Sequence, residues 1–144
     1  MLSFVTLASG SSGNAALVSC GQTHILLDAG ISARRITTAL RGLGVDPASL
    51  SGVLITHEHT DHISGLATLT KQLGLPVYAT APTLDALAMK VPAIPEKRLG
   101  RFFAPGESFP LGELWIEPFA TWHCAACGGG YAITGGDIRM VLDT

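Results

Sequence analysis

The chain has 144 residues, a formal net charge of −2, 14 % charged residues and three cysteines. This length is typical of one domain with a sizeable core, and the charge indicates no general attraction to nucleic acid or to an anionic membrane. No segment reaches the roughly 20 apolar residues that span a bilayer, and the N-terminus lacks the features of a signal peptide. Because an odd number of cysteines argues against a disulfide framework, we expect a single cytoplasmic domain, residues 1–144, without a membrane partner.

The first half of the chain alternates between predicted strands and predicted helices. Two strands, 2–8 and 15–20, flank the turn residues SGSSGN, and a third strand is predicted over 24–28. Ser32 is placed to cap a helix that runs to about Leu43. The apolar run 52–56 is then expected as a strand that is covered on both faces.

Further helices are predicted from near Asp61 to Gly74 and from Pro82 to Lys90, with a strand over 76–79 between them. From Val91 onward, prolines and short β-like runs predict a meander of strands, in which Trp115 and Phe119 are candidates for the core. Alternating strands and helices followed by such a meander indicate an α/β fold of layered sheets. The chain stops at Thr144 directly after a predicted strand, and we therefore expect the domain to be incomplete at its C-terminus.

The most informative stretch is THEHTDH, residues 56–62, which follows the apolar strand. In an extended chain His57 and His59 point the same way, and the turn into the next helix should move His62 away from them and place Asp61 beside it. Imidazoles with a carboxylate suit zinc, and also manganese or iron. Two such ions roughly 3.5–4 Å apart would hold a bridging hydroxide that is a nucleophile near neutral pH. Three histidines within six residues at a strand end favour metal binding over a polar surface loop.

This stretch and its surroundings resemble a known family. THEHTDH resembles the H-x-H-x-D-H signature of the metallo-β-lactamase superfamily. The segments LASGSSGNAALV, ILLDAGIS, GVLITHEHTDHISGL and LPVYAT are similar, in order, to its YycJ/WalJ-like branch. The resemblance implies a four-layer αβ/βα sandwich with a dinuclear metal site at the strand ends between its two sheets. This chain would cover the N-terminal half of that fold and the start of the second sheet.

The resemblance also implies two ligand sets. The first metal would be held by three histidines, His57, His59 and His123. The second would be held by Asp61, which carries the catalytic assignment, and by His62, with the strand-end Asp143 bridging both metals. A further histidine that completes the second site in this family is missing, so a C-terminal half or another copy in a homo-oligomer would have to supply it.

Two other segments are assigned with the family in view. Asp28 in LLDAG matches an aspartate that orients a histidine ring, and the alternative is a strand-end carboxylate bonded to its own turn. The SGSSGN loop lacks the lysine of a phosphate-binding P-loop. In the family this loop lies near the metal site, where Ser11, Ser12 and Asn14 would face a phosphate; a plain turn is the equal alternative.

Cys124 and Cys127 form a Cys-x-x-Cys pair directly after His123. A structural zinc site needs four ligands, and a redox dithiol should open a helix, whereas this pair runs into three glycines. Neither role fits well. Relatives of the branch carry aspartates near these positions, and Cys124 is a candidate ligand of the second metal.

The function implied by the resemblance is phosphodiester hydrolysis with two divalent metal ions, zinc first, in the manner of a 5′–3′ exonuclease acting on DNA. One alternative is a thioester or lactone hydrolase of the same fold. Another is a non-catalytic metal-binding, regulatory or oligomeric half-domain. Arg34 and Arg35 are expected on a solvated helix face, whereas Lys97, Arg98 and Arg101 form a small basic cluster that could touch a nucleic-acid backbone.

Overall fold

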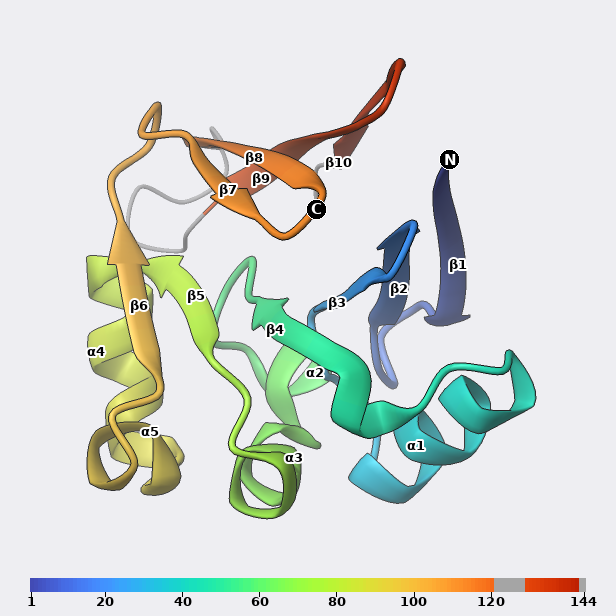
Figure 1. Cartoon of the computed structure of the whole chain (residues 1–144). Coiled ribbons are helices and arrows are strands. Elements are labelled where there is room, and N and C mark those ends of the chain that lie inside the picture. The colour runs from blue at the N-terminus through green and yellow to red at the C-terminus, as the bar shows by residue number, and fades with distance from the viewer. Residues whose placement is uncertain (121–128, 143–144) are drawn as a thin grey trace.

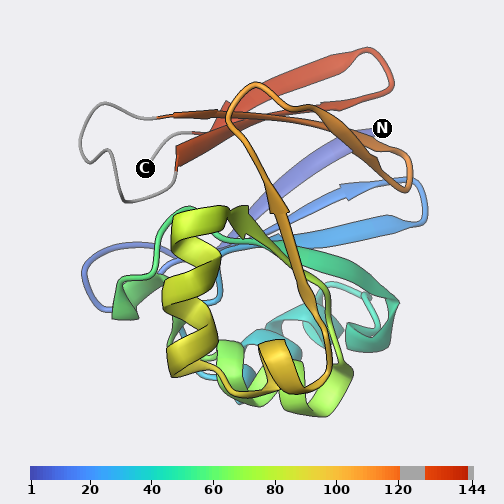
Figure 2. The same ribbon diagram turned by 90° about the vertical axis from the view of Figure 1, so that its left-hand side faces the viewer.

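Two β-sheets lie face to face, and helices cover the outer face of the first sheet (Figures 1 and 2). The computed structural model describes residues 1–120 and 129–142. Within these residues the layers are helices, first sheet and second sheet, which are three of the four layers expected of an αβ/βα sandwich.

The first sheet contains six strands in the order of the chain: β1 (Leu2–Ala8), β2 (Ala15–Cys20), β3 (Thr23–Leu27), β4 (Leu50–Leu54), β5 (Val77–Thr80) and β6 (Gly100–Phe103). The pairs β1–β2 and β2–β3 are antiparallel, whereas β3 to β6 run parallel to one another. The carboxyl ends of β3, β4, β5 and β6 therefore meet at one edge of the sheet.

The helices of the described residues are α1 (Ala33–Gly42), the short 3-10 helix η1 (Pro47–Ser49), α2 (Thr60–Ile63), α3 (Leu66–Leu73), α4 (Ala81–Lys90) and α5 (Ala93–Glu96). The predicted cap of α1 is confirmed, because the Ser32 hydroxyl accepts a hydrogen bond from the Arg35 amide at 3.2 Å. None of these helices is both long enough and apolar enough to cross a membrane.

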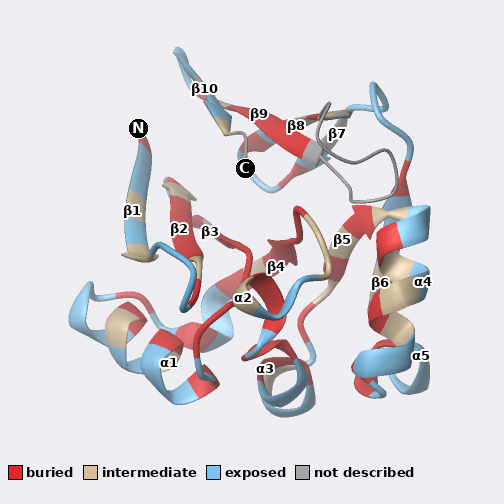
Figure 3. Ribbon diagram, turned by 180° about the vertical axis from the view of Figure 1, so that it is seen from behind, coloured by how far each residue is buried: buried red, intermediate tan, exposed pale blue. Residues whose placement is uncertain are grey.

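The second sheet is antiparallel, in the order β10 (Ile138–Leu142), β9 (Gly129–Gly135), β8 (Leu114–Ala120) and β7 (Phe109–Leu111). Apolar side chains fill both sides of the first sheet, which is why most of its strands are buried (Figure 3). Ile36 and Leu40 of α1 pack in the cluster under the helices, and Val18 meets Ile116 and Ile133 in the cluster between the sheets. Burial on two faces supplies most of the driving force for this fold.

The structure corrects two sequence predictions near the candidate site. Strand β4 ends at Leu54 and not at Thr56, so the chain leaves the sheet earlier than expected. The helix predicted from Asp61 to Gly74 is two helices, broken at Gly65. An ideal Cβ on Gly65 would lie 2.0 Å from the Ile31 carbonyl oxygen, and its amide donates to the Ala29 carbonyl at 2.8 Å. Because the Gly65 amide bonds to Ala29, and the Asp61 carbonyl four residues before it accepts from the Asn14 amide, the hydrogen-bond ladder of the helix is interrupted here.

Two further corrections concern the second half. Strand β6 joins the first sheet in parallel with β5, whereas the sequence analysis placed it in the strand meander of the second half. The alternation in β8 is as predicted, but the faces are reversed: Trp115 is 44 % exposed, whereas Leu114 and Ile116 are buried between the sheets. Alternation alone does not show which face of a strand another layer covers.

The chain passes very close to itself at Gly30, just after β3. An ideal Cβ at this position would lie 1.8 Å from the Asp61 carbonyl oxygen, which accepts a hydrogen bond from the Asn14 amide at 2.7 Å. The Gly30 amide in turn donates to the Asn14 carbonyl at 2.8 Å. Three separate segments of the chain, before β2, after β3 and at the start of α2, therefore meet here, and residue 30 has no room for a side chain.

We expect Gly30→Ala to lower the free energy of unfolding by about 3 kcal/mol, because the added methyl group must push backbone apart. Gly42→Ala is the matched control. Nothing lies within 4 Å of its ideal Cβ, and alanine in place of a helical glycine should stabilise the protein by about 0.5–1 kcal/mol. Urea unfolding followed by circular dichroism measures both variants, and a Gly30→Ala variant as stable as the wild type would contradict the close approach.

A second prediction concerns Tyr131 of β9, whose hydroxyl donates to the Ile55 carbonyl at 2.8 Å. Tyr131→Phe removes this bond and should cost about 1 kcal/mol near neutral pH. Burial, with a contribution from the charge of Asp28, raises the pKa of Tyr131 well above its usual value. The stabilisation that comes from keeping this phenol protonated is therefore complete below about pH 10, and it falls as the unfolded chain ionises at higher pH.

Because the phenylalanine variant lacks this ionisation, the difference in unfolding free energy between wild type and variant should narrow above about pH 10. Urea titrations at pH values on either side of 10 measure this difference. A difference that stays constant over the whole range would contradict the protonated, buried tyrosine.

Candidate metal centre

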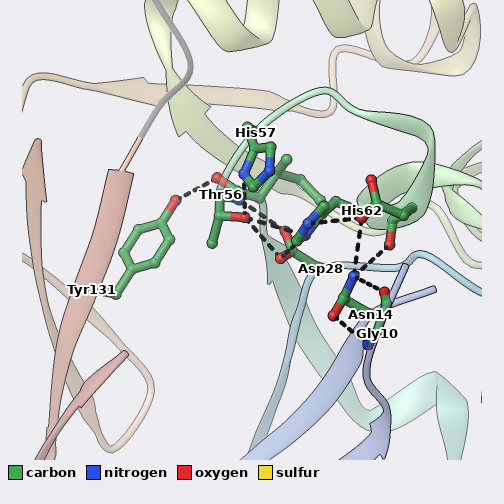
Figure 4. Close-up of polar contacts among 9 residues, drawn as sticks. Gly10, Asn14, Asp28, Thr56, His57, His62 and Tyr131 are labelled. Atoms are coloured by element: carbon green, nitrogen blue, oxygen red, sulfur yellow. Dashed lines mark hydrogen bonds and ion pairs between the residues drawn. The ribbon is translucent and has the colours of Figure 1, made fainter. Parts of the chain in front are cut away.

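The candidate site lies where β3 and β4 end, at the edge shared by the carboxyl ends of the parallel strands. Asp28 follows β3, residues 55–59 connect β4 to α2, and Asn14 enters from the loop before β2 (Figure 4). Loops at this edge of an open α/β sheet are where such folds place ligand-binding side chains.

The buried carboxylate of Asp28 holds the site together. Its Oδ1 accepts a hydrogen bond from the Thr56 amide, and its Oδ2 accepts one from the Thr56 hydroxyl, both at 2.8 Å. Oδ2 also lies 2.7 Å from Nδ1 of His62. The residue adopts φ = 60°, a left-handed conformation that aspartate tolerates better than most residues. This turn directs the carboxylate under residues 55–62, which carry His57, His59 and His62 and are called the histidine loop below.

The contact with Asp28 determines which nitrogen of His62 is available. An ionised carboxylate only accepts hydrogen bonds, so Nδ1 of His62 carries a proton. The other ring nitrogen, Nε2, lies 3.5 Å from Oδ2 of Asp61. A histidine whose far nitrogen donates to a carboxylate is the usual arrangement behind a protein metal ligand.

Three imidazoles gather in this loop. The ring centroids of His57 and His59 are 4.7 Å apart, and those of His57 and His62 are 4.0 Å apart. The sequence prediction that the turn into the helix moves His62 away from His57 is therefore wrong. The reason is that Asp28 draws His62 back beneath the loop, while Asp61 stays beside it as expected.

The pKa values of the two central rings shift in opposite directions. Burial, followed by the neighbouring His62, lowers the pKa of His57 below its usual value. Burial also acts to lower the pKa of His62, but the hydrogen bond and the charge of Asp28, together with the charge of Asp61, outweigh it, so that this pKa is raised. His57 is thus biased towards the neutral form, which is the form that binds metals.

Asn14 faces inward. Its amide nitrogen Nδ2 donates to the Gly10 carbonyl at 2.9 Å, to the Asp61 carbonyl at 3.2 Å and to Oδ2 of Asp61 at 3.3 Å. These bonds tie the SGSSGN loop to the candidate ligand Asp61. The side chains of Ser11 and Ser12, by contrast, are exposed. Of the three loop residues expected to face a phosphate, the two serines expose their hydroxyl groups to solvent, whereas the side-chain amide of Asn14 is used in bonds within the site.

Sequence reasoning missed two residues that support the site. Thr56 links Asp28 to the loop through its amide and hydroxyl, and its hydroxyl also lies 3.0 Å from Nδ1 of His57. Tyr131 reaches across from the second sheet to the Ile55 carbonyl. Thr56 ends a recognisable apolar run and could have been noticed, whereas nothing in the sequence pairs Tyr131 with a residue 76 positions away.

A small pocket of about 130 Å³ lies directly beside this cluster. Asn14 and Asp28 form part of its wall, and the rest is largely apolar, with Phe4, Ala16 and Leu27 among the lining residues. An apolar hollow next to a few convergent polar groups is a common setting for a ligand site.

The donor chemistry of the loop fits a divalent cation. Imidazole nitrogens and a carboxylate are suitable ligands, and Oε2 of Glu58 is buried without a hydrogen-bond partner among the described residues. Within residues 1–120 and 129–142, however, no group of three or more histidine, cysteine or acidic side chains is positioned to hold a metal ion. The other expected ligands, His123, Cys124 and Asp143, lie outside the described residues.

Comparisons with known proteins agree with this arrangement. The family model described as "Metallo-beta-lactamase superfamily" matches residues 8–123. The chain is 35 % identical to the exodeoxyribonuclease YycJ of Bacillus anthracis over 99 % of its own length and 54 % of that protein. It is 34 % identical to the exodeoxyribonuclease WalJ of Streptococcus pneumoniae, over 96 % of this chain and 52 % of that protein.

Solved structures give the same fold. The Rm3 metallo-beta-lactamase superimposes with a TM-score of 0.77 and 25 % identity, over 96 % of this chain and 57 % of that one. A metallo-beta-lactamase of Cronobacter sakazakii reaches a TM-score of 0.78 at 22 % identity, over 97 % and 60 % of the two chains. The chain spans about half the length of the curated relatives it matches. With its helix–sheet–sheet layers and its histidine loop at the strand ends, the chain belongs to the metallo-β-lactamase superfamily.

Proposed function

We propose that this chain carries the metal-binding part of a phosphodiesterase that acts on DNA as a 5′–3′ exonuclease. The observation that carries the proposal is the buried Asp28 carboxylate, which fixes His62 beside Asp61 and His57 at the strand edge. The names of the two relatives matched over nearly the whole chain, both exodeoxyribonucleases, support the choice of substrate.

His57 and His59, with His123, are the residues we assign to a first divalent ion, and Asp61 and His62, with Asp143, to a second. Zinc suits this set, and manganese or iron are alternatives. Divalent ions bound there would supply Lewis acidity towards a phosphoryl or carbonyl oxygen and a water nucleophile at neutral pH.

The chain's own residues prepare this site in three ways. Asp28 keeps the proton of His62 on Nδ1, so that Nε2 presents its lone pair to the site. Asn14 holds the carboxylate of Asp61 through its side-chain amide. Ser11 and Ser12, exposed on the same loop, offer hydroxyl groups to an incoming phosphate. The first two contacts fix ligand orientation before substrate arrives, which is the purpose of preorganised outer contacts.

One alternative is hydrolysis of a thioester or lactone, since the solved lactamases share the fold and Lewis acids polarise carbonyl groups equally well. The other is a non-catalytic metal-binding, regulatory or oligomeric half-domain, an alternative prompted by a match to only about half the length of the curated relatives. Turnover of bis-p-nitrophenyl phosphate against that of thioesters and lactones separates the two chemistries. Absence of all turnover by fully metal-loaded protein would favour the half-domain.

We expect His57→Ala to remove most of one equivalent of bound metal and to lower phosphodiester turnover at least about 100-fold, because a ligand of the first ion is lost. His24→Ala is the matched control, since His24 lies in β3 and pairs with Ser19. Metal analysis of the purified proteins and turnover after chelation and re-addition of zinc or manganese provide the readouts. Equal metal content in both variants would contradict the ligand assignment.

Asp28→Asn should weaken binding of the second ion by about 10- to 100-fold. An asparagine that turns its NH2 group towards His62 would donate to Nδ1, and the ring proton would then sit on Nε2, where it blocks coordination. Asp85→Asn, an exposed change on α4, should leave metal affinity unchanged. Titration with zinc in competition with a chelating dye measures both, and wild-type affinity in Asp28→Asn would overturn the assigned role of this carboxylate.

A further inference from the structure

A second feature of the molecule lies outside the metal centre. A surface pocket of about 370 Å³ opens between the end of β1 and the first turns of α1. Its lining residues are Leu7, Ile31, Arg34, Arg35, Thr38 and Ala39. The arginines and Thr38 are exposed, whereas Ile31 is buried beneath them.

Both arginines are available for a ligand. Among the described residues, neither guanidinium group forms an ion pair or a side-chain hydrogen bond, whereas Arg139 is paired with Glu117. Residues 29–45 contain three arginines and no aspartate or glutamate. This segment therefore carries a local excess of positive charge although the chain as a whole carries a charge of −2.

The pocket lies next to the metal centre. An ideal Cβ on Gly13 would lie 2.6 Å from Cγ2 of Ile31, so the SGSSGN loop touches the pocket wall. The neighbouring residue, Asn14, binds Asp61 on the other side of that loop. Among the described residues, the amides of Ser11 and Ser12 donate no hydrogen bond. The loop is thus a narrow rim with free donors, between the candidate ligands and the two arginines.

We propose that this pocket binds the backbone of one polynucleotide strand whose reacting phosphodiester lies at the metal centre. The strand would cross the loop at Ser11 and Ser12 and place a further phosphate against Arg34 and Arg35. A guanidinium group suits this role because its fork of N–H donors matches two phosphate oxygens. The inference rests on the proposed phosphodiesterase function and extends it, because it assigns a contact to a phosphate other than the reacting one.

The other basic cluster does not fit this role. Lys97 precedes β6 and Arg101 lies near its start, at the edge opposite the carboxyl ends of the parallel strands. Nζ of Lys97 donates to the Lys71 carbonyl at 2.8 Å, and Nη1 of Arg101 donates to the Arg98 carbonyl at 2.9 Å. These two cations already bond to backbone carbonyl groups, at the opposite edge of the sheet from the candidate centre, and we do not propose them as the nucleic-acid contact.

The helix also supplies a matched control. Arg41 is exposed in the last turn of α1, about 10 Å along the helix axis from Arg34, and does not line the pocket. Arg41→Gln removes the same charge from the same helix as Arg34→Gln. A comparison of the two variants therefore separates a specific contact from a general change in net charge.

The test measures binding of a 5′-labelled, phosphorothioate-linked single-stranded DNA to the metal-loaded full chain. The strand is longer than the roughly 4–16 nucleotides that an OB-fold domain covers, so that it can span both the metal centre and the pocket. Fluorescence anisotropy is recorded over a range of KCl concentrations. In Arg34→Gln, and separately in Arg35→Gln, the slope of log affinity against log salt should be less steep by about 0.7, the value for one lost phosphate contact, and Kd should rise about ten-fold. Arg41→Gln should change both values little.

Equal losses of affinity in Arg34→Gln, Arg35→Gln and Arg41→Gln would overturn the proposal. Arginine-dependent binding to phosphatidylglycerol vesicles without DNA binding would also overturn it, since the pocket would then serve a membrane surface.

Turnover of bis-p-nitrophenyl phosphate, measured on the same preparations, separates this inference from the proposed function. Normal turnover in all variants, together with DNA binding that does not depend on the arginines, would disprove the proposed role of the pocket and leave the proposed phosphodiesterase function standing. Arginine-dependent DNA binding without any turnover supports the pocket and removes the proposed hydrolysis.

Discussion

The buried carboxylate of Asp28 is the contact on which the geometry of the candidate centre depends. It accepts hydrogen bonds from the amide and hydroxyl of Thr56 and from Nδ1 of His62, so it joins the end of β3 to both ends of the histidine loop. A buried carboxylate is costly unless its oxygens are satisfied, and here each donor is also part of the loop that must be held. The same hydrogen bonds therefore stabilise the buried carboxylate and orient the candidate ligands.

This arrangement brings three segments of the chain into backbone contact, and glycines make the close contact possible. Gly30 and Gly65 have no room for a Cβ, because carbonyl oxygens of Asp61 and Ile31 occupy that space. The amides of Ala29 and Gly30 pair with carbonyl groups of the other two segments, at His62 and Asn14. Backbone buried in this way must find partners, and these bonds provide them between two loops and the short helix α2. The candidate site is thus tied together by backbone hydrogen bonds although much of it lies outside regular secondary structure.

Local features of the sequence predicted local structure well. Strands β1 and β2 have the predicted bounds, and the Ser32 cap is confirmed, because strand alternation and capping depend on neighbouring residues. The cluster of His57, His59 and His62 was recognisable from spacing, but the position of His62 next to His57 was not, since Asp28 sets it from 34 positions away. The burial of Trp115 was wrong for a related reason: which face of β8 is covered depends on where the first sheet lies. Long-range contacts decide these points, and a pattern within one element does not contain them.

Net charge is another property of the sequence that does not show where residues lie in space. A chain with a formal charge of −2 has no overall attraction to a polyanion, and from that number alone a nucleic-acid substrate looks unfavourable. The fold, however, places the acid-free segment 29–45 directly after β3, where the first turns of α1 lie beside the SGSSGN loop. The positive charges of this segment therefore lie close to the candidate site, although the sum over the whole sequence is negative. Because salt screens charges beyond a Debye length of roughly 10 Å, a phosphate bound there would interact with the arginines and the site and not with the average charge of the chain. Any metal ions held by the histidine loop would add positive charge at the same edge, so the proposed binding of a polynucleotide would depend on this one surface.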